Sequence, residues 1–299
     1  MIHKIIEIVR NDSKLFGLRG GKLSFMKMST PSSGRELGDK VLIFIFENGA
    51  TQPILCVKTT RSYKTGETIR FNFENLKRLK KSVEGYKHAN IFASPLYLYD
   101  DGEFIFSIES VCDGVKLSGR MTHVDFVLRE YSLWQAYLSQ NSESYWTKDD
   151  VVRFASETLA SLSLPDKSFS VIKKYLENFA IDSGIKLPRI LQHGDMTPDN
   201  VLISKSSISL VDYDYVSDKA LPGSDLFNFI FKLKKNNKDS RIMCERYIRS
   251  YFKEINAHVK DYEIILFISY LQEYKRKRYV ANQESGEYII SGFKDMIGR

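Results

Sequence analysis

The stretch LQHGDMTPDNVLI, residues 191–203, places a histidine, two aspartates, a threonine and an asparagine between two apolar flanks. Gly194 and Pro198 interrupt any regular helix here, so the stretch is predicted to be a shaped loop that leads into a strand near Val201. A loop that only connects two elements can have this composition. A loop that holds two acids and an amide around a metal ion has the same composition.

Two short strands are predicted after this loop, at Val201–Ser204 and Ile208–Asp212. A hairpin brings its two ends together, so Asn200 at the entry and Asp212 at the exit should lie side by side, with Asp195 facing them. One carboxylate and one amide oxygen, together with bound phosphates, are sufficient to hold Mg²⁺. A further carboxylate that does not bind the metal can orient a hydroxyl group and accept its proton.

The first third of the chain has the patterns of a small sheet with one helix. Strands are predicted at Lys40–Glu47 and Pro53–Lys58, joined by an Asn-Gly turn at 48–49. Apolar residues at helical spacing follow within 71–86, and 94–111 has the pattern of a second hairpin.

The rest of the chain is mainly helical in pattern. Helical spacing recurs at 122–140, 151–162 and 170–180 and from about Asp225 onward, and the composition changes near 109–114. We therefore predict an α+β fold in two parts, residues 1–110 and 111–299, with the division near 109–114.

The charge of the chain is moderately basic and unevenly distributed. Its 299 residues carry a net charge of +7, and 43% of them are hydrophobic, which is an ordinary globular composition. Fifteen Lys and Arg stand against nine Asp and Glu between Asn228 and Arg299. This surplus favours an anionic or uncharged partner, although a solvated basic helix face explains any single cluster as well.

Cysteine usage and the amino terminus indicate a cytoplasmic protein. The three cysteines are far apart and show no metal-ligand spacing, and no disulfide framework is implied. The first residues lack the apolar core of a signal peptide, and no apolar run is long enough to span a membrane.

Several motifs together resemble one family. HGDMTPDN (193–200) followed by LVDYDY (210–215) is similar to the H-x-D-x-x-x-x-N … D-x-[DE] signature of the aminoglycoside phosphotransferases and choline kinases. GSDLFNFIF (223–231) resembles the helix after their metal loop, and IFSIESVCDG (105–114) resembles their strand-to-hinge segment. The resemblance spans about residues 40–231 and implies the bilobal protein-kinase-like fold of these small-molecule kinases.

The resemblance implies roles for six residues. Asp195 would be the catalytic base, Asn200 and Asp212 would bind Mg²⁺, and Lys58 would hold the nucleotide phosphates. His193 and Asp225 would support the loop.

The resemblance also implies where the nucleotide, ATP or alternatively GTP, would bind. The phosphate loop would contain Ser33 and Gly34, and the hinge at Glu109 and Val111 would meet adenine through its backbone. The glutamate that pairs with Lys58 would be Glu74, with Glu67 as the alternative. Counting back by helical steps from the leucines of this helix reaches Asn72 instead.

The sequence thus predicts transfer of the γ-phosphoryl group of ATP to a hydroxyl of a small molecule or saccharide that is not polycationic. A pseudokinase or nucleotide-sensing scaffold, and an aminoglycoside-modifying kinase, are the alternatives. A nucleic-acid-associated protein ranks lower, because no binding motif accompanies the basic charge. A protein kinase also ranks lower, because D-F-G and A-P-E are missing.

Overall fold

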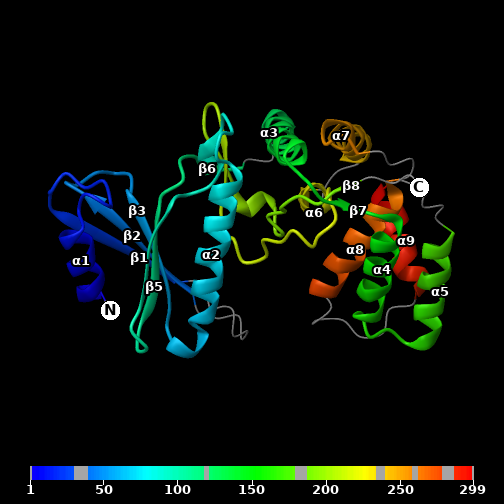
Figure 1. Cartoon of the computed structure of the whole chain (residues 1–299), viewed down its shortest axis with the longest axis horizontal. Coiled ribbons are helices and arrows are strands. Elements are labelled where there is room, and N and C mark those ends of the chain that lie inside the picture. Colours follow the sequence, from blue (N-terminus) through cyan, green and yellow to red (C-terminus); the bar gives the residue numbers. More distant parts are fainter. Residues whose placement is uncertain are drawn as a thin grey trace. The chain divides into compact units, whose positions relative to one another are not determined.

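The chain folds into two compact units. The computed structural model describes residues 2–29, 40–117, 121–178, 187–233, 240–257, 262–277 and 286–297 (Figure 1). The first unit comprises Met1–Val115 and Leu202–Asp214, and the second comprises Lys116–Val201 and Tyr215–Arg299. The division predicted near 109–114 left Leu202–Asp214 in the second part. This segment belongs to the first unit because its strand β10 packs there, beside the short helical turn η3 (Ala89–Ile91).

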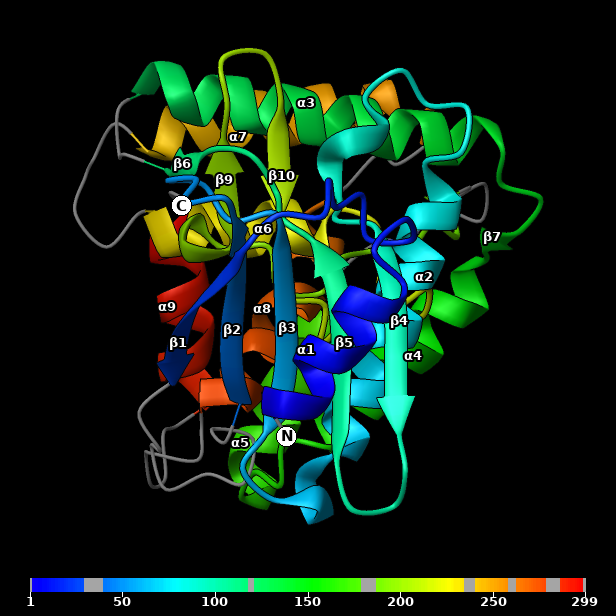
Figure 2. The same ribbon diagram turned by 90° about the vertical axis from the view of Figure 1, so that its left-hand side faces the viewer.

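An antiparallel sheet forms the centre of the first unit, with strand order β1-β2-β3-β5-β4 (Figure 2). Its strands are β1 (Leu23–Ser29), β2 (Lys40–Glu47), β3 (Leu55–Thr60), β4 (Pro95–Asp100) and β5 (Ile105–Ser110). The register of β3 with β5 pairs Cys56 with Glu109 and Lys58 with Ser107. Side chains alternate between the faces of a strand, so Lys58 and Glu109 lie on the same face of the sheet.

Helices cover both faces of this sheet. Helix α1 (Ile2–Asn11) lies over one face and α2 (Glu67–Ser82) over the other (Figures 1 and 2). On β3, Val57 joins the apolar cluster that includes residues of α1, whereas the side chain of Lys58 contacts α2. Every residue of β3 is buried, because both of its faces are covered.

The structure confirms the predicted fold class and adds two elements to the first unit. Strand β1 and helix α1 precede the strands that the sequence predicted. Helix α1 buries Ile5, Ile8 and Val9 at the three- and four-residue spacing of an amphipathic helix. This periodicity is already present in the first residues of the sequence, which lack the apolar core of a signal peptide.

The second unit is mostly helical. Its helices are α3 (Met121–Gln140), α4 (Lys148–Ala160), α5 (Asp166–Glu177), α6 (Ser224–Leu233), α7 (Ser240–Glu254), α8 (Glu263–Lys277) and α9 (Gly286–Ile297). A two-stranded sheet pairs β7 (Tyr145–Trp146) with β8 (Leu187–Pro188). Helix α6 packs against α7 and α8, and α5 packs against α9. In the described parts of the chain, no helix has both the length and the apolar character needed to cross a bilayer.

Three short strands, β6 (Val115–Lys116), β9 (Val201–Ile203) and β10 (Ile208–Leu210), form a separate sheet. A single helical turn, η4 (Pro198–Asn200), precedes β9. Both strands of the predicted hairpin are shorter than the sequence indicated. Asp212 therefore lies two residues beyond β10 rather than at its end.

Helix α4 begins with a capping box. The hydroxyl of Thr147 accepts a hydrogen bond from the backbone N–H of Asp150, and the Asp150 carboxylate accepts one from the N–H of Thr147. These bonds, with the adjacent Arg189, lower the pKa of Asp150 to about 2. The ordinary value for aspartate is ~3.9.

This lowered pKa predicts a pH-dependent contribution to stability. The contribution of the Asp150 carboxylate is complete above the unfolded pKa and is lost as the pH falls toward the folded one. Asp150→Asn should therefore lower the melting temperature at pH 7, and the difference from wild type should narrow below about pH 4. Thermal unfolding monitored by circular dichroism measures this, with the exposed neighbour substitution Asp149→Asn as the control. A difference that stays constant with pH would contradict the prediction.

Candidate functional site

The loop before β9 has a backbone shape that requires glycine. Gly194 has a φ of +83°, and a Cβ atom added there would lie 1.9 Å from the backbone oxygen of Tyr215. A neighbouring bridge pairs Gln192 with Ser217, so the two segments run side by side. No other residue type fits this close approach, and the glycine sets the position of Asp195 that follows it.

A buried carboxylate holds this loop in place. Asp225 at the start of α6 is 1% exposed and accepts hydrogen bonds from the backbone N–H groups of His193 (2.6 Å) and Gly194 (2.8 Å). The hydroxyl of Tyr131 donates a third hydrogen bond to it, at 2.7 Å. These are the contacts that the proposed supporting role of Asp225 requires. The side chain of His193 is fully buried, and its backbone supplies one of these donors.

A layer of buried amides and hydroxyls lies beneath the loop. Gln135 on α3 donates to the backbone oxygen of Leu191 (2.9 Å) and accepts hydrogen bonds from Gln192 and from the hydroxyl of Tyr251. Both glutamines are fully buried. Buried polar groups with satisfied hydrogen bonds favour one arrangement over others, and here that arrangement is the loop conformation.

Asp195 and Asn200 are joined directly. The Nδ2 of Asn200 donates to the backbone oxygen of Asp195 (2.9 Å) and to its Oδ2 (3.0 Å). The other carboxylate oxygen of Asp195 lies 3.5 Å from the Nζ of Lys232 on α6. Because the amide nitrogen faces Asp195, the Oδ1 of Asn200 is the atom that could bind a metal ion.

Asp212 and Asp214 form an acidic pair in the first unit. The Nζ of Lys40 contacts both carboxylates, at 3.3 Å from Asp212, and Asn72 donates to Asp214 at 2.8 Å. Asp212 has a φ of +68°, which is uncommon outside glycine, and its side chain remains 46% exposed. An ammonium group between two carboxylates indicates that this position attracts a cation, and the Mg²⁺ role of Asp212 stays a prediction.

The ligand set predicted for Mg²⁺ contains residues of both units. Asn200 belongs to the second unit and Asp212 to the first, so their pairing stays a prediction. Among the described residues, no three His, Cys, Asp or Glu side chains form a cluster that could hold a metal.

Lys58 is buried and held within the sheet. Its Nζ lies 2.9 Å from Glu109 on the neighbouring strand, 3.2 Å from the Oδ1 of Asn72 on α2, and over the ring of Tyr213. Burial disfavours the charged form of Lys58, but the attraction of Glu109 outweighs it, and the pKa of Lys58 is raised. Burial also raises the pKa of Glu109, against the opposing effect of Lys58.

The expected pairing of Lys58 with Glu74 is not the one that the structure has. Glu74 is exposed and forms an ion pair with Lys77, and the alternative Glu67 pairs with Arg70. Each residue advances about 100° around a helix, so Glu74, two positions after Asn72, points away from the sheet. The glutamate that reaches Lys58 comes instead from β5, because its strand neighbours β3 in the sheet.

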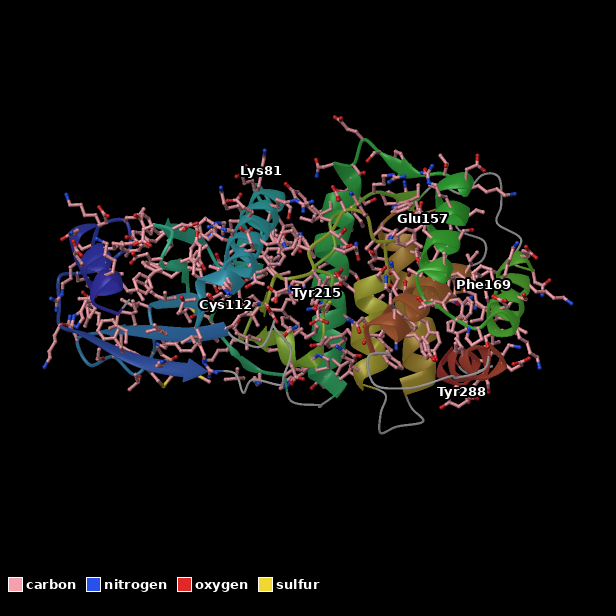
Figure 3. The ribbon with its side chains drawn as sticks, turned by 90° about the horizontal axis from the view of Figure 1, so that it is seen from below. Lys81, Cys112, Glu157, Phe169, Tyr215 and Tyr288 are labelled. Atoms are coloured by element: carbon pink, nitrogen blue, oxygen red, sulfur yellow. The ribbon has the colours of Figure 1, made fainter. Side chains whose placement is uncertain are left out.

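The structure describes only some of the other residues that were predicted to bind the nucleotide. Glu109, expected to meet adenine through its backbone, has its side chain turned to Lys58. Val111 lines a cavity of about 400 Å³ with Phe92 and Cys112. Cys112 is labelled in Figure 3, and burial raises the pKa of its thiol to about 11. Ser33 and Gly34 lie outside the described residues.

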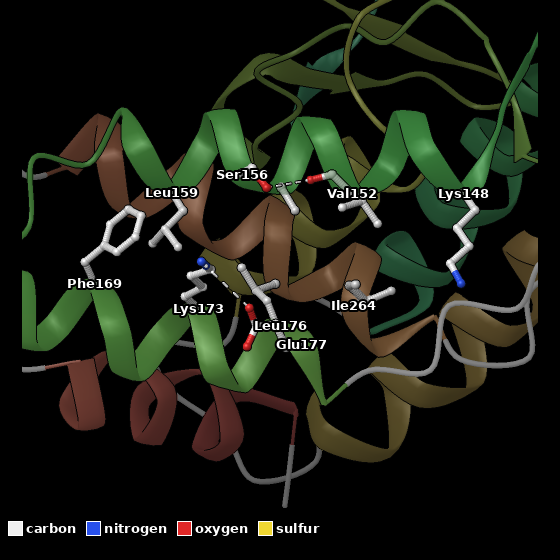
Figure 4. A pocket seen from close by; sticks show the side chains of 10 residues that line it. Lys148, Val152, Ser156, Leu159, Phe169, Lys173, Leu176, Glu177 and Ile264 are labelled. Atoms are coloured by element: carbon white, nitrogen blue, oxygen red, sulfur yellow. Dashed lines mark hydrogen bonds and ion pairs between the residues drawn. The ribbon is translucent and has the colours of Figure 1, made fainter.

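A larger cavity of about 720 Å³ lies in the second unit, away from the predicted site residues. Helices α4 and α5 flank it, and its lining is mostly apolar, including Leu159, Phe169 and Ile264 (Figure 4). No predicted site residue lines it, so its size does not make it the candidate site.

The sequence analysis missed several residues that contact the predicted site residues or the segments that carry them. Asn75, which donates to the backbone oxygen of Tyr213 at 2.7 Å, lies one helical turn from Asn72 on the buried face of α2. Two amides on an otherwise apolar helix face are a readable signal. Lys40 and Lys232 carried no such signal, because lysines on strands and helices are usually solvated.

Comparisons with known proteins reveal a shared fold. No model of a protein family and no curated protein sequence matches the chain. Solved structures do, and three of them each match most of both chains. A candidate aminoglycoside phosphotransferase of Ralstonia eutropha JMP134 is 13% identical, covering 93% of this chain and 91% of that one, with a TM-score of 0.56.

The other two are aminoglycoside phosphotransferases. A thermostable mutant of APH(4)-Ia is 12% identical, covering 95% of this chain and 94% of that one, with a TM-score of 0.53. APH(3'')-Id of Streptomyces rimosus ATCC10970, in complex with ADP and streptomycin, is 10% identical, covering 91% and 99%, with a TM-score of 0.50. The chain therefore has the kinase-like fold of these phosphotransferases, as the resemblance implied.

Removal of the Asp225 carboxylate should destabilise the second unit. Asp225→Ala leaves two backbone N–H groups and the Tyr131 hydroxyl without their acceptor, at an expected cost of about 3–5 kcal/mol. The exposed Asp199→Ala on the same loop is the matched control and should change stability by less than about 0.5 kcal/mol. Denaturant unfolding measures both, and equal effects would contradict the assignment.

Separation of the buried ion pair should destabilise the first unit. Glu109→Gln leaves a buried ammonium group without its counter-charge, at an expected cost of about 3 kcal/mol. Lys58→Met/Glu109→Gln should cost less than the two single substitutions together, with a coupling energy of about 1–3 kcal/mol. The exposed Glu103→Gln is the control. Additive single effects in denaturant unfolding would show that the pair does not interact.

Proposed function

We propose that the protein is a phosphotransferase that moves the γ-phosphoryl group of ATP to a hydroxyl of a small molecule. The observation that carries this proposal is the loop that presents Asp195 hydrogen-bonded to Asn200, with Asp225 hydrogen-bonded to its backbone. The kinase-like fold supports it. APH(3'')-Id with this fold was solved with ADP and streptomycin, which is consistent with nucleotide use here.

In the proposed reaction Asp195 acts as the base. Its carboxylate orients the acceptor hydroxyl and takes the proton as the hydroxyl oxygen attacks the γ-phosphorus. The bond from the γ-phosphorus to the bridging oxygen breaks, and ADP leaves with that electron pair. The hydrogen bond from Asn200 to Oδ2 fixes the carboxylate, and Oδ1, which lies 3.5 Å from Lys232, would accept the proton of the hydroxyl.

Mg²⁺, which Asn200 and Asp212 would hold, would neutralise charge on the phosphate oxygens. Lys40 is the cation at Asp212 and Asp214 in the structure, so it would have to withdraw from Asp212 for a metal ion to bind. Lys58 would contact the nucleotide phosphates from its position on β3, with Glu109 keeping it charged.

A nucleotide-binding protein without transfer activity is the second candidate. One observation favours it. The resemblance implies a glutamate at the position of Asn72, and Lys58 therefore contacts an amide on α2 rather than a carboxylate. The ion pair with Glu109 supplies a charge by another route, which favours the active enzyme.

Turnover should depend on both predicted carboxylates. Asp195→Ala and Asp212→Asn should each lower Mg²⁺-dependent ADP release by about 10²–10³-fold or more, because each removes a group that acts on the reacting atoms. A coupled assay across neutral sugars, amino alcohols and aminoglycosides measures this. Asp199→Ala, on the same loop but exposed, is the control and should retain wild-type turnover.

The outcomes separate the two candidates. Loss of turnover in both variants, with ATP still bound by wild type, supports the phosphotransferase. ATP binding without turnover on any acceptor supports the nucleotide-binding alternative. No binding of ATP or GTP by the wild-type protein would overturn both.

A further inference from the structure

The second unit contains a small polar cavity beside the loop that carries Asp195. It measures about 250 Å³ and is lined by residues that include Gly194, Tyr215, Asn228, Gln272 and Glu273. Gly194 immediately precedes Asp195, and Tyr215, which is labelled in Figure 3, is exposed. All the lining residues belong to the second unit, so this unit alone builds the cavity.

One buried atom in this lining has no hydrogen-bond partner. Asn228 on α6 is 6% exposed, and its Oδ1 accepts no hydrogen bond in the described structure. A buried carbonyl oxygen that has lost water without gaining a donor destabilises the fold. A ligand that donates a hydrogen bond to this oxygen would remove that cost, so the cavity is suited to a hydroxyl group.

The acidic charges around the cavity are already compensated. Lys232 lies 4.0 Å from the buried carboxylate of Glu273 and 3.5 Å from Asp195, so one ammonium group bridges both acids. The other carboxylate of the lining, Asp225, accepts three hydrogen bonds from the protein. A cationic ligand would have to displace Lys232, whereas an uncharged ligand meets no such competition.

The volume limits the size of the ligand. Pockets for drug-sized molecules measure about 300–1,000 Å³, and this cavity lies just below that range. A single sugar ring or cyclic polyol is therefore the appropriate size, and an aminoglycoside of several rings would extend beyond it.

We propose that this cavity binds the phosphoryl acceptor, that the acceptor is a small uncharged polyol or single-ring sugar, and that Asn228 accepts a hydrogen bond from one of its hydroxyls. The assignment rests on the proposed phosphotransferase function and specifies its acceptor class. Lys232 acts as the specificity-determining residue, because it compensates the acids that would otherwise attract a cation.

Ligand-observed saturation-transfer NMR on the full chain without nucleotide tests this binding directly. The probes are D-glucose and myo-inositol as uncharged rings and glucosamine as the matched amino sugar. At least one uncharged probe should bind, and more tightly than glucosamine. Asn228→Leu, which removes the unpaired oxygen at similar volume, should weaken that binding about tenfold or more. Asn178→Leu, at an exposed position after α5, is the control and should bind as wild type does.

Lys232→Met gives an independent test if Asn228→Leu does not fold. Without the ammonium group, affinity for glucosamine relative to the uncharged probes should rise about tenfold. Unchanged selectivity in this variant would overturn the role of Lys232. No binding of either uncharged probe, a wild-type preference for glucosamine, or full affinity in a folded Asn228→Leu would overturn the acceptor class.

Nucleotide binding separates this inference from the function on which it rests. A protein that binds Mg²⁺-ATP but neither uncharged probe retains the proposed phosphotransferase function and loses the acceptor class. A protein that binds an uncharged ring at Asn228 but no nucleotide retains the cavity assignment as a sugar site and loses the phosphotransferase function.

Discussion

The buried carboxylate of Asp225 is the constraint on which the candidate site depends. It accepts hydrogen bonds from two successive backbone N–H groups, so it specifies the backbone path of the loop and not only one side chain. That path takes Gly194 through a positive φ against the backbone of Tyr215, where any Cβ would collide. Asp195 emerges from this path with its carboxylate bound to Asn200. Loss of the buried acceptor would therefore disturb every later group in the loop.

In the first unit, the sheet rather than helix α2 provides the acid that pairs with Lys58. Lys58 and Glu109 stand on adjacent paired strands, so the hydrogen-bond ladder fixes the distance between them. The strand pairing places both charges, and the contact of α2 with Lys58 is through the uncharged Oδ1 of Asn72. The helix also holds the segment that carries Asp212 and Asp214, through Asn72 and Asn75. Glu109 supplies the counter-charge of the lysine, and Asn72 connects the two regions because it contacts both Lys58 and Asp214.

The shared fold at 10–13% identity to the solved phosphotransferases has a physical explanation. Apolar cores tolerate extensive substitution when volume and pattern are preserved, so most positions can change without changing the backbone. A loop with a positive φ and a buried acceptor for its own N–H groups tolerates much less. This difference explains why the short polar motif was recognisable in a sequence without a detectable relative among the curated proteins.

The sequence by itself determined the fold class, the order of most elements and the loop that carries Asp195. Local rules were sufficient for these, because they depend on neighbours in the chain. Asn48 and Gly49 adopt the positive φ angles of a tight hairpin turn, as predicted, and Thr147 with Asp150 caps α4 through residues only three positions apart. Asp225 also begins its helix where the motif indicated.

Only the tertiary structure decided which charges meet. Glu109 reaches Lys58 because β5 neighbours β3, although some fifty residues separate them, whereas the nearer Glu74 faces solvent. The contacts of Lys40 with Asp212 and of Lys232 with Asp195 and Glu273 likewise join distant segments. No local pattern encodes such pairs, because strand order and helix packing set them, and these depend on the whole chain finding one arrangement.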